Sequence, residues 1–70
     1  MNKQLFTLKE DYVELNKLLK LLSLVESGGH ANQLIKKGLV LYNGHNETRK
    51  RLKLKKGDEI IFSDTLIKII

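Results

Sequence analysis

The chain contains no cysteine, no proline and no tryptophan in its 70 residues. Without cysteine it can form neither a disulfide framework nor a thiolate metal site, which fits a protein of a reducing compartment. No apolar run approaches the roughly 18 residues of a membrane span, and the first residues lack the apolar stretch of a signal peptide. These absences predict a single soluble domain over residues 1–70, located in the cytoplasm.

Residues that carry chemistry are equally sparse. The two histidines, His30 and His45, have no neighbouring ligands at metal spacing, so we expect no metal site. None of the serines lies in a nucleophile elbow, and no glycine loop of the nucleotide-hydrolase kind is present. We therefore expect no catalytic residue and no cofactor, which means that the chain is not expected to be an enzyme.

Positive charge is the most prominent property of the chain. Lysine and arginine number 13 against 8 acidic residues, which gives a net charge of +5. Six of these cations lie between Arg49 and Lys56, a stretch without any acid. A charge run is most often only a solvated loop, so the fold must decide whether its cations share one surface. The sign of the charge favours an anionic partner, with nucleic acid as the first candidate.

A short strand and an amphipathic helix are predicted in the first third of the chain. Residues 4–8 have the composition of a strand. From residue 12 to residue 22, leucines recur at the spacing of one helix face. Asp11 is placed to cap this helix, and Glu14 occupies the capping-box position three residues later. We therefore expect the helix to begin directly after Asp11.

A second helix is predicted between Ser27, as its N-cap, and Gly38, as the left-handed residue that ends it. Gly28 and Gly29 are poor helix formers in its first turn. Two explanations remain open for them. The backbone could approach a ligand there with its free N–H groups, or the glycines could form a tight turn between the helices.

The rest of the chain has the two-residue period of strands. Asn43-Gly44 is a signal for a type I′ hairpin turn between residues 39–42 and 45–48. Two further strands are predicted at 59–62 and 65–70. The resulting order is β-α-α-β-β-β-β. It predicts an α+β fold in which two helices pack on a small, mostly antiparallel sheet.

The strand period also predicts how the side chains of the basic run are oriented, because the run contains leucine at the alternate positions 52 and 54. The cations of the run are Arg49, Lys50, Arg51, Lys53, Lys55 and Lys56. If Leu52 and Leu54 point into the core of an extended segment, the lysines between and after them point outward together. A folded scaffold would then hold several cations at spacings comparable with successive phosphates.

Aromatic residues are few, with two tyrosines and two phenylalanines. Phe6 and Phe62 lie in apolar strands, where core packing explains them. Tyr42 lies beside the hairpin turn, where it is either exposed or packed across the strands. Because single-stranded nucleic acid is usually bound by several stacking aromatic residues, the sequence favours a structured RNA recognised by shape and phosphate.

An ordered series of motifs covers residues 14–60. It consists of Leu15, Leu18 and Leu19, then Ser27, Ala31, Leu34, Ile35 and Gly38, then Val40, Asn43 and Gly44, and finally Lys55, Gly57 and Asp58. This series resembles the small RNA-binding domain named after ribosomal protein S-four, also called the alpha-L motif. The segments Ser27–Gly29 and Glu47–Lys50 are similar to those of its stand-alone bacterial members.

The resemblance implies non-enzymatic binding of structured RNA, with ribosomal RNA or a ribosomal subunit as partner and a role in ribosome assembly or maturation. Gly28 and Asn32 stand where many members of the family have a basic residue. This shifts the expected contacts toward the lysines and the basic run, with Asn32 as a neutral hydrogen-bonding substitute. The residues expected to bind RNA are Lys17, Lys20, Ser27, Gly28, Gly29, Asn32, Lys36, Arg49, Lys50, Arg51, Lys53 and Lys55.

Two other functions remain open. The chain could be a protein-interaction adaptor whose basic face binds an acidic partner. It could also bind DNA, although the second helix is polar rather than rich in arginine, unlike a reader of the major groove. In each case we expect a monomer that does not contact a membrane.

Overall fold

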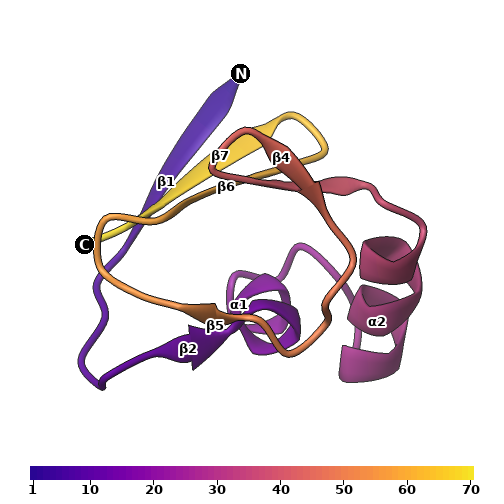
Figure 1. Cartoon of the computed structure of the whole chain (residues 1–70), viewed down its shortest axis with the longest axis horizontal. Helices are drawn as coiled ribbons and strands as arrows, with labels where there is room; N and C mark the ends of the chain where they lie inside the picture. Colours follow the sequence, from indigo (N-terminus) through magenta and orange to yellow (C-terminus); the bar gives the residue numbers. More distant parts are fainter.

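The computed structural model describes all 70 residues, with two helices on one side of a five-stranded sheet (Figure 1). Its elements are β1 (Asn2–Phe6), β2 (Val13–Glu14), α1 (Leu15–Leu21), α2 (Gly28–Lys36), β3 (Val40–Tyr42), β4 (His45–Glu47), β5 (Lys53–Leu54), β6 (Glu59–Phe62) and β7 (Thr65–Ile69). The large sheet has the order β1-β7-β6-β3-β4, and only β1 and β7 are parallel. The predicted α+β fold with a mostly antiparallel sheet is confirmed.

Two short strands, β2 and β5, are additional to the predicted order, and β2 changes where the first helix starts. Val13 and Glu14 form β2, which pairs antiparallel with β5 in a separate two-stranded sheet. Helix α1 therefore begins at Leu15, and the predicted N-cap at Asp11 is wrong. Glu14 is the N-cap residue, and its side chain makes no capping hydrogen bond. Val13 is buried, which explains why the strand pairing prevails over the capping-box pattern.

The second helix begins and ends as predicted. The Ser27 hydroxyl accepts a hydrogen bond from the His30 N–H at 3.1 Å, as an N-cap does. Gly38 has a φ of 77°, the left-handed conformation that glycine adopts easily. The N–H groups of Gly38 and Leu39 donate to the carbonyls of Ile35 and Leu34 at 2.9 and 3.3 Å. These two bonds form a Schellman motif, which ends the helix by satisfying its last carbonyls.

The hairpin turn is also as predicted. Asn43 and Gly44 have φ values of 48° and 90°, and a type I′ turn requires positive φ at both positions. Asn43 then links this turn to the next one, because its amide nitrogen donates to the Asp58 carboxylate at 3.3 Å. The same carboxylate accepts from the Lys55 N–H at 2.8 Å. Asn43 and Asp58 therefore fix the turn that follows β5.

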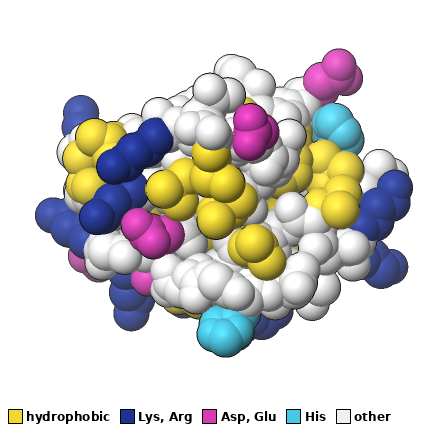
Figure 2. All heavy atoms as spheres, turned by 90° about the horizontal axis from the view of Figure 1, so that it is seen from above, with side chains coloured by type: hydrophobic (Ala, Val, Ile, Leu, Met, Phe, Trp, Pro, Cys, Tyr) yellow, Lys and Arg dark blue, Asp and Glu magenta, His cyan; other side chains and the backbone are white.

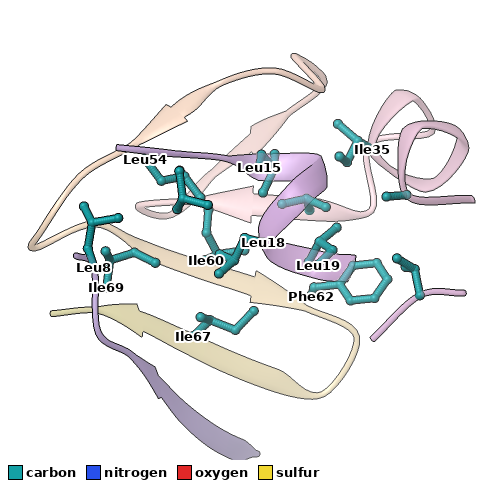
Figure 3. Packing of buried hydrophobic residues seen from close by; sticks show 14 residues of the cluster. Leu8, Leu15, Leu18, Leu19, Ile35, Leu54, Ile60, Phe62, Ile67 and Ile69 are labelled. Carbon is teal, nitrogen blue, oxygen red and sulfur yellow. The ribbon is translucent and has the colours of Figure 1, made fainter. Parts of the chain in front are cut away.

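The core lies between the helices and the large sheet, and Figure 3 shows its side chains pointing into one shared space. Helix α1 contributes Leu15, Leu18 and Leu19, each with no exposed surface. The other fully buried members are Ile35, Val40, Leu54, Ile60, Ile67, Ile69 and Ala31. Because Leu54 is among them, β5 is fixed to the same core as the large sheet.

The face of the large sheet that points away from the helices is uncovered. Figure 2 shows this face, with hydrophobic side chains across its middle and lysine or arginine toward its margins. Leu41, Ile61 and Leu66 are half-buried neighbours on adjacent strands, and Leu5 of the edge strand β1 is 58% exposed. Neither helix has the length and apolar character that crossing a membrane requires.

Candidate nucleic-acid interface

The basic segment, defined here as residues 49–53, is held by backbone bonds to the start of α1. The Lys50 carbonyl accepts from the Asn16 N–H at 3.0 Å, and the Leu52 carbonyl accepts from the Leu15 N–H at 2.9 Å. Free N–H groups in the first turn of a helix need such acceptors, and here the basic segment supplies them in place of a side-chain cap. The segment therefore has a fixed position beside α1.

The predicted alternation of leucine and lysine over residues 52–55 is confirmed. Leu54 has no exposed surface, and the half-buried Leu52 packs against the core. Lys53 and Lys55 are exposed, as a two-residue period requires when the leucines face inward. The cations are thus carried by anchored backbone rather than by a free loop.

The chain segment from Thr48 to Lys50 faces α2 across a hollow, which we call the polar hollow. The side chains that line it are Asn32, Gln33, Lys36, Thr48, Arg49 and Lys50. None of them is hydrophobic, and three of them are cations. Four residues that were predicted from separate parts of the sequence, Asn32, Lys36, Arg49 and Lys50, therefore lie together.

Arg49 is positioned by an acid that the sequence analysis did not assign to the site. The carboxylate of Glu47 accepts from Nε of Arg49 at 2.9 Å, from Nη2 at 3.1 Å and from its backbone N–H at 3.0 Å. These bonds to Arg49 hold the pKa of the Glu47 carboxyl below its usual value of 4.5, although burial opposes them.

The contact with Glu47 leaves much of Arg49 accessible. Its side chain is 69% exposed, and the edge formed by Nη1 and Nη2 carries N–H groups that Glu47 does not use. That edge can donate two parallel hydrogen bonds to a phosphate or a carboxylate. Residues two positions apart in an extended chain lie on one side, and this spacing was the available signal for the Glu47–Arg49 pair.

The polar hollow is closed at its α1 side by a second pair that the sequence analysis missed. The amide nitrogen of Asn16 donates to the side-chain oxygen of Asn32 at 3.0 Å and so joins α1 to α2. This bond occupies the acceptor of Asn32 and leaves its amide N–H groups available. Asn32 is thus oriented as a hydrogen-bond donor, which suits a negatively charged or carbonyl-rich ligand.

The remaining predicted residues do not all join the polar hollow. Lys17 lines a different hollow on the other side of α1, together with residues 6–14 and Leu21. The ammonium group of Lys53 lies 4.9 Å from the centre of the Tyr12 ring, which borders that same hollow. Lys20, Arg51 and Lys55 are exposed and line neither hollow.

Gly28 and Gly29 are the first two residues of α2 and not a turn between the helices. No atom lies within 4 Å of a Cβ built on Gly28, and only the Ser27 hydroxyl, at 3.9 Å, comes near one built on Gly29. Neither glycine has a positive φ. Internal packing and backbone conformation therefore do not require glycine at either position, and contact of this helix start with a ligand stays a prediction.

Comparison with known proteins identifies the class to which this fold and surface belong. A model of the S4 domain matches residues 6–70. A protein of Escherichia coli (strain K12) named "Putative RNA-binding protein YbcJ" is 39% identical over 62 residues, a match that covers 89% of each chain. A protein of Shigella flexneri, called uncharacterized protein YbcJ, has the same identity and coverage. The chain therefore belongs to the S4 domain family.

The solution structure of YbcJ from E. coli is described as revealing an alpha-L motif involved in RNA binding. It superposes on this chain with a TM-score of 0.71 at 39% identity, and the match covers 94% of this chain and 85% of that one. The resemblance to the alpha-L motif that the sequence indicated is therefore confirmed.

Proposed function

We propose that the chain binds folded RNA, with ribosomal RNA as the partner, and that it catalyses no reaction. The observation that carries this proposal is the polar hollow, where α2 and the basic segment bring Lys36, Arg49 and Lys50 together. Because the backbone that carries these cations is already fixed, binding of phosphates costs side-chain entropy but little backbone entropy. The names of the relatives, which give RNA binding, support the same proposal.

The surface suits a folded RNA better than a single strand. Lysine and the free edge of Arg49 would contact phosphates, and the amides of Asn32 and Gln33 would bond to 2′-hydroxyl groups or base edges. No aromatic residue lines the polar hollow, so stacking of successive bases has no platform there. A role in ribosome assembly, performed by a cytoplasmic monomer, is the biological setting that we propose for this binding.

Salt titration tests the electrostatic part of the proposal. If the interface neutralises about four to six phosphates, the logarithm of the affinity falls against the logarithm of the salt concentration with a slope of roughly −3 to −5. Hairpin RNA and duplex DNA of the same length would be compared at each salt concentration, with hairpin RNA expected to bind more tightly. A slope near zero, or tighter binding to the duplex DNA, would contradict the proposal.

The partner is tested with cell extract. Ribosomal subunits are separated by sedimentation, and we expect the chain to travel with them at low salt and to be released as salt rises. An acidic polypeptide such as polyglutamate serves as competitor. If polyglutamate releases the chain at the same charge concentration as hairpin RNA does, the adaptor function with an acidic partner is favoured instead.

A further inference from the structure

A second hollow lies outside the surface assigned above. It has a volume of about 800 Å³ and lies between α1 and the chain that leads from β1 to β2. The residues that line it are Phe6, Thr7, Leu8, Lys9, Glu10, Asp11, Tyr12, Val13, Glu14, Lys17 and Leu21. We call it the Tyr12 hollow. Its volume falls within the range of roughly 300–1,000 Å³ that is usual for small-molecule sites.

The Tyr12 hollow is close to the polar hollow, because the two lie on opposite sides of the first turn of α1. Asn16 bonds to Asn32 on one side, whereas its neighbour Lys17 lines the Tyr12 hollow on the other. The basic segment connects the two sides as well. Arg49 and Lys50 line the polar hollow, and Lys53 lies over the Tyr12 ring. An RNA that follows the basic segment therefore reaches both hollows.

Tyr12 is an exposed aromatic residue at the edge of this hollow. It is 41% exposed, and the ammonium group of Lys53 lies over its ring, 4.9 Å from the centre. A cation over the ring favours one ring position by attraction to its π-electrons. Aromatic rings of this kind stack on the bases of unpaired nucleotides, and a nearby lysine can bind the phosphate of the stacked nucleotide.

Three carboxylates line the same hollow, which at first conflicts with RNA binding. Glu10, Asp11 and Glu14 form no ion pair and no side-chain hydrogen bond within the chain, so their oxygens are available as acceptors. An ionised carboxylate can accept two parallel hydrogen bonds, but it repels phosphate. Among the four bases of RNA, only guanine presents two neighbouring N–H donors, N1–H and N2–H, on one edge. The carboxylates therefore suit the base edge of a guanine.

We propose that the Tyr12 hollow binds one unpaired guanine nucleotide of an RNA that is docked on the basic segment. The base takes the place of the Lys53 ammonium group over the Tyr12 ring, and its N1–H and N2–H groups donate to a carboxylate of the hollow. Lys17 or the displaced Lys53 contacts its phosphate. This inference rests on the proposed RNA binding. It adds a contact that selects one base to the phosphate, 2′-hydroxyl and base-edge contacts proposed for the polar hollow.

The test uses RNA stems that differ by one unpaired nucleotide. One stem is fully paired, and the others carry a single guanine, adenine, cytosine or uracil bulge at successive positions. The protein carries Tyr42→Phe, so that Tyr12 is its only tyrosine and reports stacking by fluorescence, since the chain has no tryptophan. At the best position, the guanine bulge is expected to raise the affinity about tenfold over the paired stem and to quench the fluorescence of Tyr12.

Two variants test whether the gain in affinity from the guanine bulge depends on the ring of Tyr12. Tyr12→Ala is expected to lose the gain from the bulge while it keeps the affinity for the paired stem, and Tyr12→Phe is expected to keep both. Because the side chain is exposed, both variants should fold, which circular dichroism would check.

Three results would overturn the inference and leave the proposed function in place. They are a paired stem that binds as tightly as every bulged stem, an adenine bulge that binds as tightly as the guanine bulge, and a gain that survives in Tyr12→Ala. The first of these is also the result expected if the hollow binds a protein segment. If no stem binds at all, the proposed RNA binding fails, and this inference fails with it.

Discussion

Glu47 fixes the conformation of the basic segment at the scale of single residues. It is a largely buried acid in a basic protein, and its carboxylate holds both the backbone and the guanidinium of Arg49. Without this acceptor, Arg49 would be free to leave the polar hollow. The acid therefore serves the cationic surface even though its charge has the opposite sign.

Replacing Glu47→Gln tests this role. The folded protein holds the pKa of Glu47 below 4.5, so the carboxylate stabilises the fold fully above that pH, and the contribution is lost as the pH falls through the lowered value. Water around Arg49 screens the pair, so we expect a loss of at most about 1 kcal/mol at neutral pH. Urea unfolding at pH 7 and pH 3 measures it. A difference between the two proteins that stays equal at both pH values would contradict this role.

A substitution at Asn32 is expected to raise the affinity for RNA. The variant Asn32→Lys adds a cation to the polar hollow at a position where many S4 domains have a basic residue. We expect RNA affinity to rise by about tenfold and the salt slope to steepen by about 1, although the bond to Asn16 is lost. The variant Asn2→Lys, on exposed β1, adds the same charge far from the hollow and serves as control. Equal gains in both variants would show that only net charge matters.

At the scale of elements, the two helices start by different means. Helix α2 uses the Ser27 side chain, whereas α1 uses the backbone carbonyls of the basic segment. The start of α1 and the position of the basic segment are thus one structural unit, together with the short pairing of β2 and β5. This unit carries the cations at the positions that the proposed RNA binding needs.

Two variants test whether α2 depends on a side-chain cap and α1 does not. Ser27→Ala removes a side-chain cap and is expected to lower the free energy of unfolding by about 1 kcal/mol. Asp11→Ala removes the residue that the sequence placed as a cap, and we expect a change within about 0.5 kcal/mol because α1 starts four residues later. Chemical denaturation measures both variants. A larger loss for Asp11→Ala than for Ser27→Ala would contradict the observed start of α1.

Leu54 anchors β5, and its truncation should loosen the basic segment. Leu54→Ala is expected to lower the free energy of unfolding by about 2–5 kcal/mol, since it leaves a cavity at a site with no exposed surface. The amide hydrogens of Asn16 and Leu15, which bond to the basic segment, should exchange faster with solvent than those inside β6. Leu5→Ala on exposed β1 is the matched control and should change stability little. Uniform faster exchange across the chain would show that β5 is not a separate anchor.

At the scale of the whole molecule, the two faces of the large sheet differ in chemistry. One face is covered by the helices, next to which the basic segment and both hollows lie. The other is uncovered, with hydrophobic side chains across its middle (Figure 2). Leu41, Ile61 and Leu66 are half-buried neighbours on adjacent strands of that face. Lys3 and Lys68 are exposed residues of β1 and β7 on that second face. The positive charge of the protein is therefore spread over both faces of the sheet. Only the cations near α2 lie beside the uncharged polar side chains that line the polar hollow.

Local patterns were sufficient to predict most of the fold. The leucine period marked the core face of α1, Ser27 and Gly38 marked the ends of α2, and Asn43-Gly44 marked the hairpin. Each of these signals acts between residues that are close in sequence, so the sequence alone reveals them.

The features that the sequence did not reveal depend on distant partners. The pairing of β2 with β5 joins residues about forty positions apart, and the start of α1 depends on it. The Asn16–Asn32 bond and the separation of Lys17 from the polar hollow likewise follow from how the helices pack. No local propensity encodes such contacts, so the cations could be identified from sequence but not divided between two hollows.

The central claim is that RNA binds beside α2 and the basic segment rather than to positive charge in general. The most direct measurement compares two double variants that remove equal charge from opposite faces of the sheet. For Lys36→Ala/Lys50→Ala and for Lys3→Ala/Lys68→Ala, the affinity for hairpin RNA is measured as a function of salt concentration. We predict that the first pair lowers the affinity at least about tenfold and makes the slope shallower by about 2, and that the second pair changes both little. Equal effects of the two pairs would contradict the claim.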